Sequence, residues 1–184
     1  MKKLLTYCRL AYFSYFSRPA KDRVLYRAIR RGGISRIVEL GMEQGLRSVR
    51  MIDVAMQTQT EGPIRFTGID LFEMSPASGG MSLKAAHCRL QATGARVRLV
   101  PGDPFSALAM AANHVGPCDL IVIGAGQDAE SLAKAWFYVP RLLQPTTRVF
   151  LERPCGADAS IHFELVSHDE IRRLAQAATR RTAA

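Results

Sequence analysis

Short apolar runs alternate with segments of helical periodicity along most of this chain. The runs are four to seven residues long and rich in Val, Ile and Leu, so they predict five strands, at 36–40, 64–70, 97–100, 119–123 and 148–152. Between them apolar residues recur at helical spacing, and Gly and Pro mark the junctions. Strands separated by helices predict an α/β fold whose mainly parallel sheet is covered on both faces.

A sixth apolar run, at 161–167, follows the fifth strand after a linker of only eight residues. A parallel crossover needs about a dozen residues or more, so this linker is too short for one. We therefore expect the sixth strand to lie antiparallel at the edge of the sheet. A helix at 169–180 is predicted to close the chain.

The remaining elements are predicted from helical spacing and from breaker residues. Helices between the strands are expected near 45–57, 82–92, 106–113 and 128–143, with Ser82 as an N-cap and Pro140 as a kink in the last. Residues 74–80 are rich in Ser, Gly and Pro and predict a loop. Helices at 2–16 and 20–31 precede the first strand. We divide the chain into a basic N-terminal helical arm, 1–33, and a body, 34–184.

Composition places the chain among ordinary globular proteins. Its 184 residues fit one domain, and 48% are apolar and 22% charged. The four cysteines are scattered without a CxxC pair, so neither a zinc site nor a disulfide framework is expected, and a cytoplasmic setting fits best. No apolar run is long enough to predict a membrane span.

Charge is distributed unevenly along the sequence. Residues 1–50 hold 12 Lys and Arg against three acids, whereas residues 51–184 hold 13 bases and 13 acids. The net charge of +9 is therefore assigned to the N-terminal segment. Such a segment can bind nucleic acid, anionic lipid or an acidic protein surface, or it can be a solvated helix surface.

The first predicted helix adds aromatic residues to these charges, at positions 7, 12, 13, 15 and 16. One interpretation is packing on the body or pairing of two subunits into a homodimer. Another is peripheral attachment to a membrane, since aromatic and basic side chains suit the headgroup layer.

Candidate chemistry begins where the first two strands end. Glu39 lies at the end of the first strand, Gly41 and Gly45 follow in the loop, and Asp70 ends the second strand. Glycines allow a backbone to approach a ligand closely, and an acid on the second strand can bind ribose hydroxyls. This layout is typical of a nucleotide-type cofactor site.

Four segments resemble the class I S-adenosylmethionine-dependent methyltransferases, specifically a divergent member of their small O-methyltransferase-like branch. They are VELGMEQG, FTGIDLFE, LVPGDPFSAL and the stretch from CDLIVIGAG to RVFLE, and together they span about 34–152. The resemblance implies a Rossmann-like fold with strand order 3-2-1-4-5 plus an antiparallel edge strand. It also implies S-adenosylmethionine as cofactor and a small molecule as methyl acceptor.

The resemblance implies a role for each matching position. Glu39 would face the methionine amino group, with Gly41 and Gly45 beside the methionine part, and Asp70 would bind the ribose. Leu71 and Phe72 would flank the adenine, and Asp103 would recognise its amino group. The far wall of the site would be lined by Gly124 and Ala125.

Each position also has a structural interpretation, and these alternatives remain open. The glycines can serve strand–helix packing, Asp70 can cap a helix or form an ion pair, and Asp103 can stabilise a turn between Gly102 and Pro104. A nicotinamide site would favour G-x-G-x-x-G, which the sequence GMEQGL from residue 41 does not match.

The sequence departs from the family at two places. Glu43 stands where many such loops carry a glycine. Residues 124–127, after the fourth strand, read GAGQ, with no carboxylate until Asp128. No metal site is therefore expected, and no catalytic base is identified. The alternative function is a non-enzymatic interaction module with a degenerate cofactor site, docking a membrane or nucleic acid through its arm.

Overall fold

A six-stranded sheet of order β3-β2-β1-β4-β5-β6 forms the centre of the molecule. The computed structural model describes residues 2–59, 62–75, 80–155 and 160–182. Five strands are parallel and β6 pairs antiparallel with β5, so both the predicted strand order and the antiparallel edge are confirmed. The strands are β1 Arg36–Leu40, β2 Arg65–Asp70, β3 Arg96–Pro101, β4 Leu120–Ile123, β5 Arg148–Cys155 and β6 Ser160–Val166.

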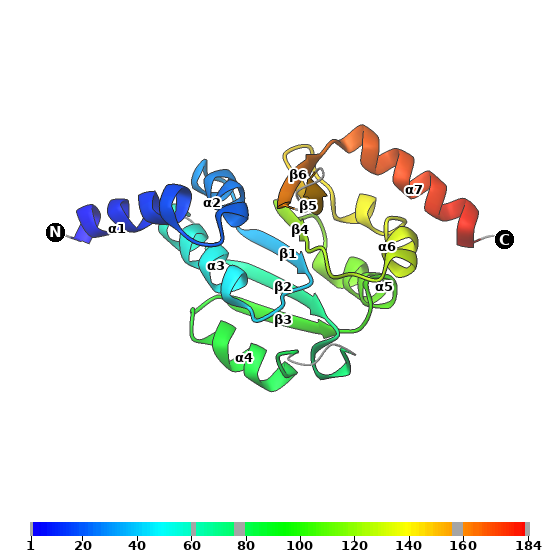
Figure 1. Cartoon of the computed structure of the whole chain (residues 1–184), viewed down its shortest axis with the longest axis horizontal. Helices are drawn as coiled ribbons and strands as arrows, with labels where there is room; N and C mark the ends of the chain where they lie inside the picture. The colour runs from blue at the N-terminus through cyan, green and yellow to red at the C-terminus, as the bar shows by residue number, and fades with distance from the viewer. Residues whose placement is uncertain (1, 60–61, 76–79, 156–159, 183–184) are drawn as a thin grey trace.

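Helices cover both faces of the sheet, as the alternation of elements predicts (Figure 1). One face packs against α2 (Arg23–Arg30), α3 (Leu46–Thr58) and α4 (Leu83–Gln91). The other packs against α5 (Pro104–Val115), α6 (Ala129–Ala135) and α7 (His168–Thr182). Each face therefore has its own hydrophobic core.

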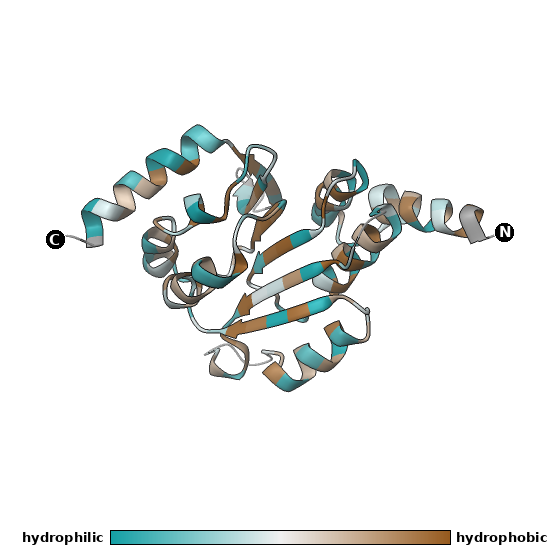
Figure 2. Ribbon diagram, turned by 180° about the vertical axis from the view of Figure 1, so that it is seen from behind, coloured by the Kyte–Doolittle hydropathy of each residue, from teal (hydrophilic) through white to brown (hydrophobic). Residues whose placement is uncertain are grey.

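Burial differs between the central and outer strands. All four residues of β4 are buried, whereas three of the six residues of β3 are exposed and only Val100 is buried. Figure 2 shows the consequence as hydrophilic positions alternating with hydrophobic ones along the lowest strand, β3. Because β3 is an outer strand that the helices cover incompletely, it can carry charged side chains at positions that would be buried in a central strand.

The N-terminal arm contributes to the core as well as to the surface. Helix α1 (Lys2–Ala11) continues as one π-helical segment, η1 (Tyr12–Phe16), and a 3₁₀ turn, η2 (Ala20–Asp22), leads into α2. Leu25, Tyr26 and Ile29 are fully buried against α3. The division of the chain at residue 33 stays a prediction.

The outer side of α1 and η1 carries exposed large side chains. Figure 1 shows α1 extending away from the sheet, at the opposite end of the molecule from α7. At least half of each of these side chains is exposed: Leu4, Leu5, Tyr7, Tyr12, Tyr15 and Phe16. Homodimer pairing and membrane docking through this surface stay predictions. Among the described residues, no helix has the length and apolar character that crossing a membrane requires.

The long helix predicted at 128–143 is wrong. Helix α6 ends at Ala135, and after a turn the chain forms a separate 3₁₀ segment, η4 (Val139–Leu142), with Pro140 in its first turn. A proline lacks the N–H that continues an α-helix and clashes with the preceding turn. Trp136, Val139 and Leu142 are buried, so the broken path still covers the sheet. Residues 76–79 of the predicted 74–80 loop lie outside the described residues.

Two methionines of α3 test the assignment of its buried face. Met51 is fully buried and Met56 is 43% exposed. Replacing Met51 by Ala should lower the free energy of unfolding by about 3 kcal/mol, because it removes packed atoms and leaves a cavity. The matched change Met56→Ala should cost well under half as much. Urea unfolding of both variants measures this, and equal losses would contradict the orientation of α3.

Candidate functional site

The predicted site residues gather where the parallel strands end. From β1 the chain builds the sheet first toward β3 on one side and then toward β5 on the other, so the topological switch point lies between β1 and β4. Ligands of open α/β sheets bind at such a point, outside the carboxyl ends of the strands. Glu39 and Asp70 lie on β1 and β2, and Gly124 follows β4. Gly41 N–H donates to the Ile69 carbonyl at 2.9 Å, and Gly124 N–H to the Leu40 carbonyl at 2.8 Å. These bonds hold the loops close together.

Glu39 is paired inside the protein. Its side chain is fully buried and accepts hydrogen bonds from Arg47 Nε at 2.6 Å and from Ser48 Oγ at 2.5 Å. Arg47 Nη2 also donates to the carbonyl of Gly41 at 2.6 Å. One guanidinium therefore joins the end of β1, the glycine loop and the first turn of α3.

The ion pair extends into a buried charge network. Arg47 Nη1 lies 3.6 Å from Glu152 Oε2 on β5, and Lys21 of the arm bonds the other oxygen of Glu152. Glu152 Oε2 also accepts from the N–H of Ala125 at 2.9 Å. Asp22 is 2% exposed, and among the described residues its Oδ1 has no hydrogen-bond partner.

Burial and neighbouring charges shift the pKa values of this network in opposite directions. Burial raises the pKa of Glu39, while the charge of Arg47 and the Ser48 hydroxyl lower it. Burial also raises the pKa of Asp22, against the opposing charges of Arg47 and Lys21. Burial by itself disfavours the charged Arg47, but Glu39 outweighs this, and the pKa of Arg47 rises. The guanidinium is therefore held charged.

The glycines stand where side chains have no space. A Cβ on Gly41 would lie 2.2 Å from Gln127 Nε2, and one on Gly124 would lie 2.9 Å from the carbonyl oxygen of Gly41. Gly41 and Gly45 also have φ values of 76° and 70°, which favour glycine. Gly45 is the N-cap of α3 and faces Met81. Packing thus accounts for these glycines, and the Gln127 amide covers Gly41.

Asp70 binds the loop that follows β1. Its Oδ2 accepts from the N–H of Met42 at 2.6 Å and of Glu43 at 3.2 Å, and its Oδ1 from the N–H of Phe72 at 3.2 Å. Glu43 has a φ of 54°, so it adopts the left-handed conformation that a glycine often supplies. A carboxylate accepts about four hydrogen bonds, so Asp70 keeps capacity for a ligand.

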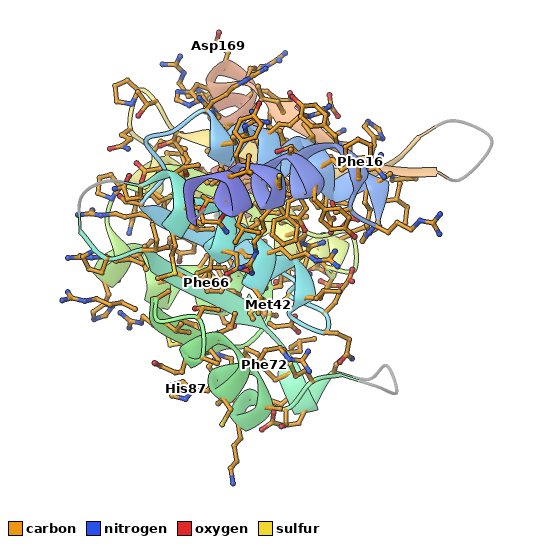
Figure 3. The ribbon with its side chains drawn as sticks, turned by 90° about the vertical axis from the view of Figure 1, so that its left-hand side faces the viewer. Phe16, Met42, Phe66, Phe72, His87 and Asp169 are labelled. Carbon is orange, nitrogen blue, oxygen red and sulfur yellow. The ribbon has the colours of Figure 1, made fainter. Side chains whose placement is uncertain are left out.

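The two residues after Asp70 lie on different sides of the loop. Leu71 is partly exposed, whereas Phe72 is 2% exposed and belongs to the core with Met42. Figure 3 labels Met42 and Phe72 below the arm. Leu71 is thus the more accessible of the two, and Ala125 is exposed on the opposite side, after β4.

Asp103 caps a helix in this structure. Its Oδ1 accepts from the N–H of Phe105 at 3.0 Å, from the N–H of Ser106 at 3.2 Å and from the Ser131 hydroxyl. Its Oδ2 accepts from the Ser106 hydroxyl. Although burial raises the pKa of Asp103, the Ser106 and Ser131 hydroxyls and the backbone N–H groups hold it at about 2. Asp103 thereby joins the first turns of α5 and α6.

Arg47 and Gln127 are the residues that the sequence pattern did not single out. Arg47 falls on the same helical face as the buried Met51, Val54 and Ala55. A charged residue on an apolar face was therefore a usable signal for a buried partner. Gln127 had no such signal, because only the fold brings it over Gly41.

Comparisons with known proteins identify the fold. No family model matches the chain, and no curated protein matches it. Among solved structures, the chain is similar to an O-methyltransferase from Bacillus cereus in complex with SAH, at 14% identity and a TM-score of 0.57, covering 100% of this chain and 78% of that one. The O-methyltransferase TomG from Streptomyces achromogenes, in complex with SAM, has 14% identity and a TM-score of 0.56 over 96% and 78%.

A precorrin-6y C5,15-methyltransferase from Geobacter metallireducens is also similar, at 15% identity and a TM-score of 0.51 over 74% of this chain. The chain spans 63% of that protein's length. The fold is thus the Rossmann-like fold of the class I methyltransferases, and the resemblance seen in the sequence is confirmed at this level.

The acid dependence of stability tests the environment of Asp103. A carboxyl group whose pKa falls from 3.8 to about 2 on folding stabilises the native state above the higher value and loses this contribution as the pH falls. Asp103→Ala should therefore cost about 1 kcal/mol at neutral pH, with a smaller difference from wild type near pH 2. Asp103→Asn retains a capping acceptor and should cost less at neutral pH. A pH-independent difference in urea unfolding would contradict this assignment.

A second prediction concerns the buried ion pair. Arg47→Met should lower the free energy of unfolding by about 3–5 kcal/mol, because it leaves Glu39 buried without its charge partner. The double variant Glu39→Gln/Arg47→Met should recover part of this loss, whereas Arg173→Met on the exposed side of α7 should have little effect. Together with the single variant Glu39→Gln, these proteins form a double-mutant cycle in urea unfolding, and additive losses would show that the two side chains are not coupled.

Proposed function

We propose that this chain binds S-adenosylmethionine at the carboxyl ends of β1 and β2 and transfers its methyl group to a small-molecule acceptor. The observation that carries the proposal is Asp70, a partly exposed carboxylate beside the glycine loop at the point where the sheet order reverses. Two of the similar structures contain this cofactor or its demethylated product. When bound, the cofactor supplies an electrophilic methyl group on a sulfonium.

The residues at the ribose and adenine end fit such a ligand. Asp70 accepts three backbone hydrogen bonds and retains capacity for ribose hydroxyls. Leu71 offers a partly exposed apolar side chain next to it. Ala125 is exposed on the opposite side. Asp103 is less suited to bind adenine directly, because two hydroxyls and two backbone N–H groups already occupy it.

The residues that would bind the methionine part of the cofactor fit it only after two side chains rearrange. Arg47 donates to both Glu39 and the Gly41 carbonyl, which are the acceptors that an ammonium group would use there. Gln127 lies directly over Gly41. Cofactor binding therefore requires the Gln127 side chain to move away, and Arg47 to yield or share its acceptors. We expect weaker binding than at a site with free acceptors, because these interactions are lost on binding.

A cavity beside the glycine loop is the proposed entrance for the acceptor. It has a volume of about 170 Å³ and is lined on one side by Pro19, Lys21 and Asp22 of the arm and on the other by residues 42–44, 46 and 47. Asp22 brings an unpartnered, buried carboxylate oxygen with a raised pKa, which suits a proton acceptor. We assign Asp22 as the base for an acceptor that loses a proton.

The second candidate function is a non-enzymatic module that keeps the fold without binding the cofactor. The Arg47–Glu39 pair favours it, because an internal cation then takes the place of the methionine ammonium permanently. Binding of S-adenosylhomocysteine separates the two functions. Calorimetry that detects no binding at millimolar ligand would support the module and overturn the enzyme.

The role of Asp70 gives a sharper test of the cofactor site. Asp70→Ala should weaken S-adenosylhomocysteine binding at least about tenfold, because a charge-assisted hydrogen bond contributes about 1.5–3 kcal/mol. The matched change Glu130→Ala removes an exposed carboxylate of α6 and should leave binding unchanged.

Because Asp70 also holds the loop, the ligand must be varied too. An analogue without ribose hydroxyls should bind wild type more weakly than S-adenosylhomocysteine does, yet Asp70→Ala should bind the two equally. If the variant still discriminates between them as wild type does, Asp70 does not bind the ribose.

A further inference from the structure

The opposite end of the sheet carries a second cluster of charged residues. Every parallel strand except β4 begins with an arginine: β1 with Arg36, β2 with Arg65, β3 with Arg96 and β5 with Arg148. Figure 3 views the molecule from this end. These residues lie at the amino ends of the strands, whereas the cofactor site lies at the carboxyl ends.

Strand register places three of these arginines side by side. Arg36 pairs with Arg65, and Arg65 pairs with Arg96. Neighbouring strands lie about 4.8 Å apart, so the three side chains leave one face of the sheet as a row. Residues paired across neighbouring strands form one rung of the sheet. Arg98 pairs with Thr67, two residues along from the Arg65–Arg96 pair, so it belongs to the next rung on the same face. Two rungs therefore supply four guanidinium groups, from Arg36, Arg65, Arg96 and Arg98.

These arginines line one cavity. It has a volume of about 280 Å³ and is bounded by the arginine row, by Thr67 and by the last turn of α5, at His114 and Val115. None of the described residues that line it is acidic. The side chains of Arg65, Arg96 and Arg98 form no hydrogen bond or ion pair within the described ranges 2–59, 62–75, 80–155 and 160–182, whereas Arg36 donates to the Pro117 carbonyl at 3.1 Å.

One acid, Asp119, is engaged beside the cavity and does not line it. Asp119 precedes β4, and its Oδ2 accepts from the N–H and hydroxyl of Ser35 and from the N–H of Arg36. Its Oδ1 accepts from Gln144 Nε2 at 2.6 Å. Like charges opposite one another on neighbouring strands are destabilising, so the row has an unfavourable self-interaction. The carbonyl end of α5 offsets part of it, since cations are favoured at a helix C-terminus.

We propose that this cavity is a second ligand site, one that binds the diphosphate group of a small molecule. Guanidinium groups form paired hydrogen bonds with phosphate oxygens, and a row of three matches an anion with several charges. The Thr67 hydroxyl adds a neutral donor. The cavity is slightly smaller than the ~300–1,000 Å³ that encloses a drug-sized ligand, so it holds the anionic group and leaves the rest of the molecule in solvent.

Binding of sodium diphosphate to the full chain tests this proposal. Calorimetry should detect binding at an ionic strength fixed with sodium chloride, and inorganic phosphate should bind more weakly because it meets fewer arginines. The double variant Arg65→Gln/Arg96→Gln should weaken diphosphate binding at least a hundredfold, about tenfold for each guanidinium. Arg173→Gln removes one exposed charge from α7 and should bind as wild type does.

Thermal unfolding supplies an independent readout, in which the variant that loses diphosphate binding should gain stability. Without ligand, Arg65→Gln/Arg96→Gln should melt above wild type, because it relieves repulsion in the row. With diphosphate, the melting temperature of wild type should rise and that of the variant should stay unchanged. Loss of folding in the variant is therefore not the expected cause of weak binding.

Three outcomes would overturn the proposal. The first is diphosphate binding that survives in Arg65→Gln/Arg96→Gln. The second is absence of binding to wild type. The third is a single-stranded oligonucleotide that binds through the same arginines when free diphosphate does not, which would identify a nucleic-acid surface. None of these measurements involves S-adenosylhomocysteine, so failure here and failure at the cofactor site are distinguishable.

Discussion

The ion pair between Glu39 and Arg47 is the interaction on which the arrangement at the carboxyl ends of the strands depends. It joins β1 to the first turn of α3, and its second guanidinium nitrogen fixes the Gly41 carbonyl. Through Glu152 it reaches β5 and the N–H of Ala125. A charge in such a poorly solvated place must have partners, so the surrounding elements take positions that provide them.

The same interaction explains why the arm belongs to the site. Glu39, Glu152 and Asp22 supply three acids to the network, whereas Arg47 and Lys21 supply two bases. Among the described residues, one acid of the network is therefore left without an ion-pair partner, and the unpartnered Oδ1 of Asp22 identifies it. Since Lys21 of the arm is the ion-pair partner of one Glu152 oxygen, the arm is part of the charge network at the carboxyl ends of the strands.

The sequence predicted those features that depend on local pattern. Short apolar runs and glycine junctions are local, and they indicated the strands that the structure contains. The helix at 128–143 failed because Pro140 cannot continue an α-helix, and α6 ends at Ala135 ahead of it. The site was predicted only in its backbone positions. Whether Glu39 faces solvent or Arg47 depends on side-chain packing, which spacing along the chain does not encode.

The distribution of charge in the folded structure also could not be predicted from spacing along the chain. Counted along the sequence, the basic character belongs to residues 1–50, because residues 51–184 have equal numbers of acids and bases. Counted in space, Arg65, Arg96 and Arg98 of that neutral part stand beside Arg36 in one cavity. Register across parallel strands brings them together, and register is a property of the sheet rather than of any segment. The correct unit for assigning charge in this fold is therefore the rung of the sheet.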